Sequence, residues 1–178
     1  MNYGELNLAG DQIVLRVPTV DDAEAVFTEY AADPDVTRYM TWQSHDDVAT
    51  VASFMSDVVA RNDSGAEFNW AIAQNGNDRL IGMISARFRG HMADIGYVLG
   101  KKYWGRGYMT EAVTMLSSTI LARSDIFRVW AVCDVDNIGS ARVLEKSGFE
   151  REGVLRRYML HPNISSEPRD CLAYARVK

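Results

Sequence analysis

The sequence predicts one α/β domain of the α+β type, in which a mixed, mostly antiparallel central sheet is flanked by helices. Three observations lead to this prediction. Helical patterns come first, three strand patterns follow one another in the middle of the chain, and strands then alternate with helices toward the end. A chain of 178 residues is long enough for one core, and no repeat or linker divides it, so we expect a single domain over residues 1–178.

The first third of the chain predicts a strand and two helices. Residues 13–17 alternate apolar and polar side chains, and Pro18 ends this strand. Thr19, with an acid three residues later, is typical of a helix start, and the helix is expected to end near residues 33–34. Ser44 has the same spacing to Asp47 and predicts a second helix that ends at residues 62–65. We expect its inward face to carry Val48, Val51, Ala52, Met55, Val58 and Val59.

The middle of the chain predicts three strands at residues 68–74, 80–88 and 92–99. The turn-rich residues 75–78 join the first two, which indicates an antiparallel hairpin. A helix over residues 108–122 follows, with a buried face made of Ala112, Val113, Leu116, Ile120 and Leu121.

The last third of the chain predicts strands separated by one helix. The strand is expected at residues 128–134, and the helix starts at residues 136–137, runs to Lys146 and ends at Gly148. Two closing strands are expected at residues 154–160 and 171–177.

Composition and charge exclude several classes of function. A formal net charge of −5 lacks the basic excess that nucleic-acid binding needs. No apolar run is long enough to cross a membrane, and the first ten residues do not resemble a secretion signal, so we expect a cytoplasmic protein. The two cysteines, Cys133 and Cys171, and the three histidines have no metal-binding spacing, and we expect no metal.

The most informative segment is the strand, loop and helix at residues 95–112. Gly105 and Gly107 allow a tight turn just before a helix, and the unpaired amides at a helix start form an anion site that suits a pyrophosphate. Arg106 is expected either to add a contact to a phosphate or to be solvated on the loop. No Walker motif occurs, and Thr110 stands where the dinucleotide fingerprint needs a third small residue. Two glycines alone, however, are common in turns for structural reasons.

A second motif lies at residues 137–149, Asn-Ile-Gly-Ser-Ala-Arg-Val-Leu-Glu-Lys-Ser-Gly-Phe. Together with residues 105–112 it resembles the GNAT superfamily of acyl-CoA-dependent N-acetyltransferases. Within that superfamily the chain is similar to the branch of bacterial ribosomal-protein N-terminal acetyltransferases (RimJ/RimL-like). The resemblance covers nearly the whole chain, and it implies a GNAT-like fold with splayed strands at the acyl-CoA site and acetyl-CoA as cosubstrate.

The resemblance assigns expected roles to individual residues. The backbone of Tyr97, Val98 and Leu99 would pair with the pantetheine arm and polarise the thioester carbonyl. Asn137 would contact the pantetheine arm, and Ser140 would donate a proton to the departing CoA thiolate. The loop and helix start would hold the pyrophosphate, which adds to the cofactor-binding residues Trp104, Gly105, Arg106, Gly107, Tyr108, Met109 and Thr110.

The chain departs from the family pattern at the catalytic positions. Leu144 stands where many relatives have a tyrosine acid, which leaves Ser140 or solvent to protonate the thiolate. Val132 and Met159 stand where some relatives have a glutamate base, so Asp94 is our candidate base, with water as the alternative. Ser140 and Asn137 also suit helix caps, and Asp94 also suits a solvated strand position. Cys133 fits a small core residue.

The sequence predicts less about the acceptor. We expect Trp42, Tyr39 and Phe68 to line its pocket, although aromatic residues also serve cores. The acceptor is a primary amine, either a protein N-terminus or a small molecule, and the acyl group is acetyl or a larger group such as succinyl. A non-catalytic acyl-CoA-binding or sensing domain and a nucleotide-binding protein remain as alternatives, and a homodimer is left open.

Overall fold

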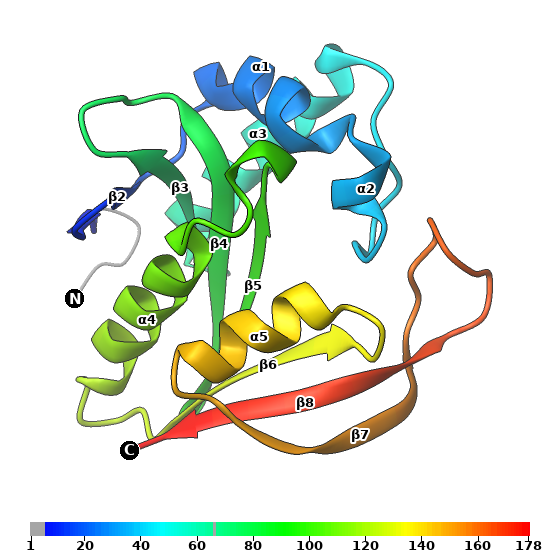
Figure 1. Ribbon diagram of the computed structural model, residues 1–178. Helices are drawn as coiled ribbons and strands as arrows, with labels where there is room; N and C mark the ends of the chain where they lie inside the picture. The colour runs from blue at the N-terminus through cyan, green and yellow to red at the C-terminus, as the bar shows by residue number, and fades with distance from the viewer. Residues whose placement is uncertain (1–5, 66) are drawn as a thin grey trace.

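The computed structural model describes residues 6–65 and 67–178 and contains an eight-stranded sheet in the order β1-β2-β3-β4-β5-β6-β8-β7 (Figure 1). Its strands are β1 (Leu8–Ala9), β2 (Ile13–Arg16), β3 (Phe68–Gln74), β4 (Leu80–Arg89), β5 (Met92–Leu99), β6 (Arg128–Asp134), β7 (Glu150–Met159) and β8 (Arg169–Val177). β5 and β6 run parallel, and the other neighbouring strands run antiparallel. The predicted mixed, mostly antiparallel sheet is therefore confirmed. Residues 1–5 and 66 of the expected domain lie outside the described residues.

The helices carry most of the differences from the predicted elements. They are α1 (Ala23–Val26), α2 (Pro34–Thr37), α3 (Val48–Ser64), α4 (Tyr108–Leu121) and α5 (Ile138–Lys146). The predicted first helix is divided into a 3-10 turn at Val20–Asp22, α1 and a π-helical turn η3 (Phe27–Ala31). A 3-10 turn η4 (Lys101–Tyr103) precedes the glycine loop. Such short turns have no period of their own in the sequence, which is why periodicity missed them.

The start of α3 and two residues of its inward face are corrected. Asp47 caps the helix, because its Oδ1 accepts a hydrogen bond of 3.0 Å from the Ala49 N–H. The Ser44 hydroxyl instead bonds the Thr37 hydroxyl. Val48 and Ala52, both expected to face inward, are exposed, while Val51, Met55 and Val58 are fully buried.

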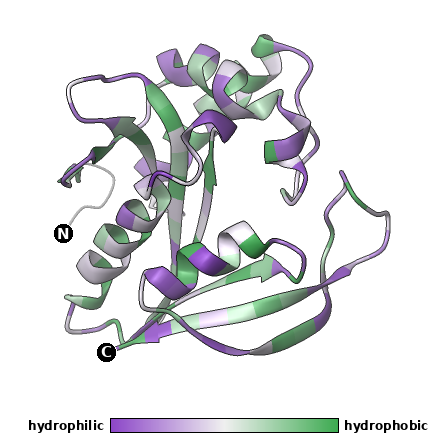
Figure 2. Cartoon of the chain, in the orientation of Figure 1, coloured by the Kyte–Doolittle hydropathy of each residue, from purple (hydrophilic) through white to green (hydrophobic). Residues whose placement is uncertain are grey.

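Two apolar layers cover the two faces of the sheet. α4 packs Leu116 and Ile120 on one face, and α5 adds Leu144 to the same cluster. α1 and α3 cover the upper half of the other face and pack against Ala71 and Met83. Figure 2 shows hydrophobic segments along β4 and β5, where the two layers meet. Burial on both faces explains why these two strands read as nearly continuous apolar runs.

β5 and β6 separate after a short paired region. β4 and β5 are paired along the whole of β5, from Gly82↔Leu99 to Arg89↔Met92. β5 and β6 are paired at Met92↔Arg128, Ala93↔Val129 and Asp94↔Trp130. Beyond Asp94 the described part of β5 has β4 as its only strand neighbour, and Figure 1 shows β5 and β6 diverging. The expected splay is therefore present, and it leaves backbone groups of β5 facing an opening.

Candidate active site

A cavity of about 800 Å³ lies beside the end of β5, between that strand and the start of α5. This volume lies within the range of ~300–1,000 Å³ that is usual for ligand clefts. Its walls come from α2 and the residues after it, from β5, from η4 and the start of α4, and from α5. The structure thus brings together residues that are far apart in the chain, including these residues expected to bind the cofactor: Tyr97, Val98, Leu99, Trp104, Gly105, Gly107, Tyr108, Met109, Thr110, Asn137 and Ser140.

The start of α4 has the features of an anion site. Gly107 is the N-cap residue with φ 86°, a left-handed conformation that glycine adopts without strain. None of the described side chains caps this helix end, so the first N–H groups of α4 lack partners within the helix. Those amides, together with the helix dipole, favour a negatively charged group at the cavity wall.

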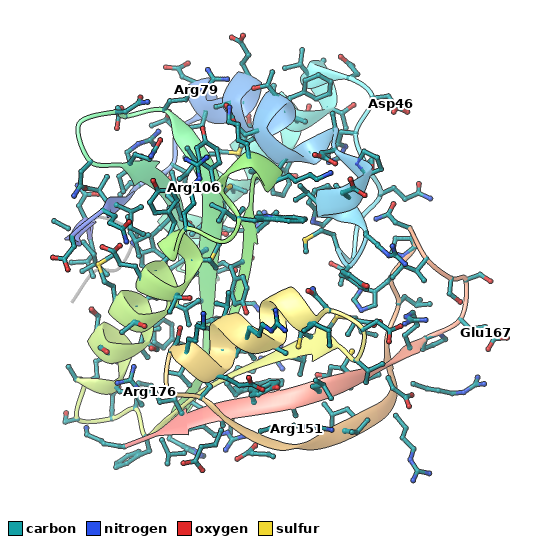
Figure 3. The ribbon with its side chains drawn as sticks, viewed as in Figure 1. Asp46, Arg79, Arg106, Arg151, Glu167 and Arg176 are labelled. Atoms are coloured by element: carbon teal, nitrogen blue, oxygen red, sulfur yellow. The ribbon has the colours of Figure 1, made fainter. Side chains whose placement is uncertain are left out.

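Arg106 is placed differently from the expectation. It is exposed on the loop between β5 and α4 and is not among the residues that line the cavity (Figure 3). The cations that do line the cavity come from other elements, and they are Arg38, Lys101, Arg142 and Lys146. The cavity therefore has positive charge for a phosphorylated ligand, but Arg106 is not part of its wall.

The backbone of β5 presents polar groups to the opening. The Gly100 N–H donates to the Ile81 carbonyl of β4, and the groups of successive residues in a strand point to opposite sides. The backbone groups of Leu99 and Tyr97 therefore face away from β4 and toward the opening. The Leu99 carbonyl accepts a hydrogen bond of 2.8 Å from the Trp104 indole. The Trp104 side chain therefore occupies one of the backbone groups that face the opening. The Tyr97 backbone and the Leu99 N–H are left to face a ligand.

Ser140 and Tyr97 meet across the opening. Their hydroxyl oxygens are 2.8 Å apart, and the Tyr97 hydroxyl also lies 3.2 Å from the Ser140 carbonyl oxygen. Burial raises the pKa of Tyr97, and the hydrogen bond with Ser140 offsets this only in part, so the phenol is neutral near pH 7. Either hydroxyl can be the donor in this pair, and when the phenol donates, the serine proton is free to point into the cavity. Sequence reasoning assigned Tyr97 a backbone role and missed its side chain.

Two further residues near Ser140 have structural roles. The Asn137 Oδ1 accepts a hydrogen bond of 3.1 Å from the Ser140 N–H, so Asn137 caps α5 while also lining the cavity. Cys133 is buried, and burial raises the pKa of its thiol to about 11, although a hydrogen bond with Ser140 lowers it in part. A thiol with this pKa is protonated near pH 7 and suits the expected core position better than a nucleophile.

An ion-pair network centred on a buried carboxylate leads into α5. Asp134, fully buried at the end of β6, bonds the Arg169 guanidinium with a shortest distance of 2.6 Å and accepts a hydrogen bond of 2.9 Å from the Asp136 N–H. The Asp136 carboxylate bonds the same guanidinium. Burial alone would raise the pKa of Asp134, but these hydrogen bonds outweigh it, and the pKa is lowered. The network fixes the turn from which Asn137 and Ser140 project.

Asp134→Asn is expected to destabilise the fold by about 3 kcal/mol at neutral pH, because it leaves the buried side of Arg169 unpaired. A carboxyl whose pKa is lowered in the folded state contributes stability above its unfolded pKa of about 3.9. That stability is lost as the pH falls through the lower folded pKa. The unfolding free energy of wild type, measured in urea, should therefore fall below about pH 4, and that of the variant should fall less. Asp46→Asn, at an exposed position, is the control. If the unfolding free energy depends on pH equally in wild type and Asp134→Asn, the stabilising role assigned to the Asp134 carboxylate is contradicted.

Asp94, the candidate base, lies outside the cavity. Its carboxylate pairs with the Arg87 guanidinium at 2.7 Å from Nε, and it lines a separate small cavity of about 130 Å³ together with Val132 and Met159. The pairing Asp94↔Trp130 is the last between β5 and β6 before they separate, so Asp94 stands at the closed end of the opening. The structure thus does not bring Asp94 to the position expected of a base.

One of the three expected acceptor residues lines the cavity. Tyr39 does, and its hydroxyl donates to the Asp136 carbonyl at 3.2 Å. Trp42 stacks on His45 with ring centroids 5.4 Å apart, and Phe68 packs edge-on against Phe88. Neither Trp42 nor Phe68 is among the lining residues, so both are corrected to packing positions.

The wall that carries Tyr39 is fastened by the loop between β7 and β8. The Asn163 side-chain amide donates to the carbonyls of Thr37 at 2.7 Å and Trp42 at 2.8 Å. His161, nearly fully buried, packs edge-on against Tyr39. No local sequence pattern indicates these contacts, because they span more than 100 positions.

Comparison with known proteins agrees with this geometry. The family description "Acetyltransferase (GNAT) domain" matches residues 12–150, most of the chain. The chain belongs to the GNAT acetyltransferase family. It is 32% identical over 174 residues to the uncharacterized N-acetyltransferase YoaA of Bacillus subtilis, covering 96% of each chain. It is 26% identical to the [ribosomal protein uS5]-alanine N-acetyltransferase of Escherichia coli, covering 89% of this chain and 86% of that one.

A solved GNAT structure shares the fold over nearly the whole chain. The microcin C7 self-immunity acetyltransferase MccE, solved in complex with acetyl-CoA and AMP, superposes with a TM-score of 0.84 at 25% identity and covers 95% of this chain and 94% of its own. The resemblance to the RimJ/RimL-like branch is confirmed, and the chain is an N-acetyltransferase of the GNAT family. None of the described helices is long and apolar enough to span a membrane.

Proposed function

We propose that this GNAT enzyme binds acetyl-CoA in the opening between β5 and β6 and transfers the acetyl group to an α-amino group by direct attack. One observation carries the proposal. A single cavity joins the uncapped start of α4 at one end to the Ser140–Tyr97 hydroxyl pair, with free β5 backbone groups beside it. Such a cavity suits a ligand with a phosphate end and a reactive end.

The residues of the chain fit the two ends of acetyl-CoA. The amides at residues 107–110 and the ammonium groups of Lys101 and Lys146 would hold the phosphates. Bound acetyl-CoA supplies an activated acyl group, whose carbonyl oxygen gains negative charge during transfer. The Leu99 N–H and the Tyr97 backbone, which face the opening, are preorganised donors for that charge. Asn137 would contact the pantetheine arm.

Ser140 is the proposed proton donor to the CoA thiolate. The bond from nitrogen to the acyl carbon forms as the carbon–sulfur bond breaks, and the sulfur takes the electron pair. The Ser140 hydroxyl gives its proton to that sulfur and regains one from the Tyr97 hydroxyl at 2.8 Å, while the proton that the new amide nitrogen loses returns to Tyr97 through water. Direct transfer needs no acyl-enzyme, in keeping with the protonated, buried Cys133 thiol.

The charges in the cavity favour an α-amino acceptor. Asp35 and Asp136 are the carboxylates among the described lining residues, and both are held in ion pairs, with Lys101 and Arg169. Deprotonation of the amine then falls to water. At pH 7.5 roughly a quarter of an α-amino group is neutral, against roughly a thousandth of a lysine side chain. An α-amino group, such as a peptide N-terminus, is therefore the better acceptor.

Thiol release from acetyl-CoA with matched acceptors tests the proposal. Short peptides with a free N-terminus should react at least 10-fold faster at pH 7.5 than the same peptides with a blocked N-terminus and one lysine. The difference should shrink as the pH rises toward 10, because lysine then loses its proton. A faster lysine acceptor at neutral pH would contradict the α-amine assignment. Tight acetyl-CoA binding without release on any amine would support the non-catalytic sensor instead.

Tyr97→Phe is expected to lower kcat about 10-fold, since the Ser140 hydroxyl loses the partner that orients and reprotonates it. The ring keeps its packing, so the KM for acetyl-CoA should change less than twofold. Steady-state kinetics at saturating acceptor measure both constants. An unchanged kcat would show that Ser140 needs no proton from Tyr97.

A further inference from the structure

Glu29 is a buried carboxylate held between two cations. It lies on the π-helical turn η3, and its side chain is 3% exposed. The carboxylate bonds the Lys102 ammonium at 2.7 Å and the Arg79 guanidinium at 2.9 Å. Lys102 belongs to η4, immediately before the glycine loop, while Arg79, labelled in Figure 3, directly precedes β4. The carboxylate thus ties η4 to the first helical region.

The loop before α4 is fastened to the same helical region at two further points. A β-carbon added to Gly100 would lie 2.7 Å from the Glu29 carbonyl oxygen, so the two backbones are in close contact. The Lys101 ammonium bonds the Asp35 carboxylate of α2 at 2.5 Å. Lys101 lines the large cavity, whereas Lys102 is not among the lining residues. The two neighbouring lysines therefore differ in role, and Lys102 is directed to Glu29.

We infer that Glu29 is a positioning residue for acetyl-CoA, which acts through Lys102 to hold η4 and thereby the amides at the start of α4. This inference rests on the proposed binding of the CoA phosphates at those amides. Trp104 and Gly105 follow η4 directly, so a shift of η4 moves the loop that turns into the helix. Ser140 and Tyr97 lie on α5 and β5 and do not depend on the Glu29 carboxylate for their contact. Loss of the Glu29 pair should weaken acetyl-CoA binding and leave the chemical step intact.

The sign of the effect separates positioning from simple electrostatics. Glu29→Gln removes a negative charge close to the site of a polyanionic ligand, so charge alone predicts tighter binding. Positioning predicts weaker binding, because the loop amides are no longer held where the phosphates need them. We expect the Kd for acetyl-CoA to rise about 10-fold, with kcat at saturating acetyl-CoA within twofold of wild type.

Lys102→Met and Arg79→Met form a matched pair of variants. Each removes one of the two cations bound to the same buried carboxylate, and both side chains are partly exposed, so both variants should fold. We expect similar losses in unfolding midpoint. Only Lys102→Met should raise the Kd for acetyl-CoA, and Glu29→Gln combined with Lys102→Met should add little to either change alone.

Calorimetric titration of each variant with acetyl-CoA, beside urea unfolding and steady-state kinetics, decides the question. Unchanged or tighter binding by Glu29→Gln would overturn the inference. Equal weakening by Lys102→Met and Arg79→Met would overturn it too, because it would indicate a general loss of stability. Absence of acetyl-CoA binding by wild type would instead contradict the proposed function.

Discussion

Gly107→Glu is expected to abolish acetyl-CoA binding, with a rise in Kd of at least 100-fold. Gly107 occupies the N-cap position of α4 with φ 86°, and the first amides of that helix face the cavity without partners among the described side chains. A glutamate adds a side chain and a negative charge at the place proposed for the phosphates. Like charges within ~4 Å repel by about 4 kcal/mol near a protein surface, which is enough for this loss.

Gly107→Gln is the control for backbone strain. Glutamine has nearly the same size as glutamate and pays the same cost of about 1–2 kcal/mol for the left-handed conformation, but it carries no charge. Gly107→Gln should bind acetyl-CoA more weakly than wild type and more tightly than Gly107→Glu. Titration calorimetry, with thermal unfolding to check the fold, measures all three. Wild-type affinity in Gly107→Glu would refute the assignment of the loop.

Ser140→Ala is expected to lower kcat about 100-fold, within the usual range for loss of a general acid. Its hydroxyl lies 2.8 Å from the Tyr97 hydroxyl and lines the cavity, so its loss removes the proposed donor to the thiolate. The cap of α5 should survive, because Asn137 accepts its hydrogen bond from the Ser140 backbone N–H. The unfolding free energy and the KM for acetyl-CoA should therefore change little.

The size of the loss in Ser140→Ala decides the role of Ser140, because solvent can also protonate the leaving CoA thiolate. Wild-type turnover in Ser140→Ala, measured with purified variant under saturating acetyl-CoA, would assign Ser140 to the helix start alone. A parallel fall in kcat and in unfolding free energy would point to damage of α5 instead.

Local patterns predicted the framework and most of the expected cofactor-binding residues that line the cavity. The glycine pair, the apolar stripe of α4 and the 137–149 helix each depend on residues close in sequence, and the structure places them around one cavity. The π-helical turn η3 was missed, because the same apolar residues also fit a continuous helix. Glu29 was missed with it, since a buried carboxylate has no sequence signal apart from partners distant in the chain.

The errors at Asp94 and at the acceptor aromatics have a common cause. Position along a strand does not show where two neighbouring strands separate, and Asp94 falls on the paired side of that point. Trp42 and Phe68 were expected in a pocket on aromatic character alone, whereas both are used in packing. Whether such a residue reaches the cavity depends on sheet register and tertiary packing, which local patterns in a single sequence do not reveal.

A crystal structure of the protein with CoA tests the central claim most directly. We expect the pyrophosphate within hydrogen-bond distance of the amides at residues 107–110, the pantetheine arm between β5 and β6, and the sulfur near the Ser140 hydroxyl. CoA bound at another surface, or bound in the cavity with its sulfur away from Ser140, would contradict the account.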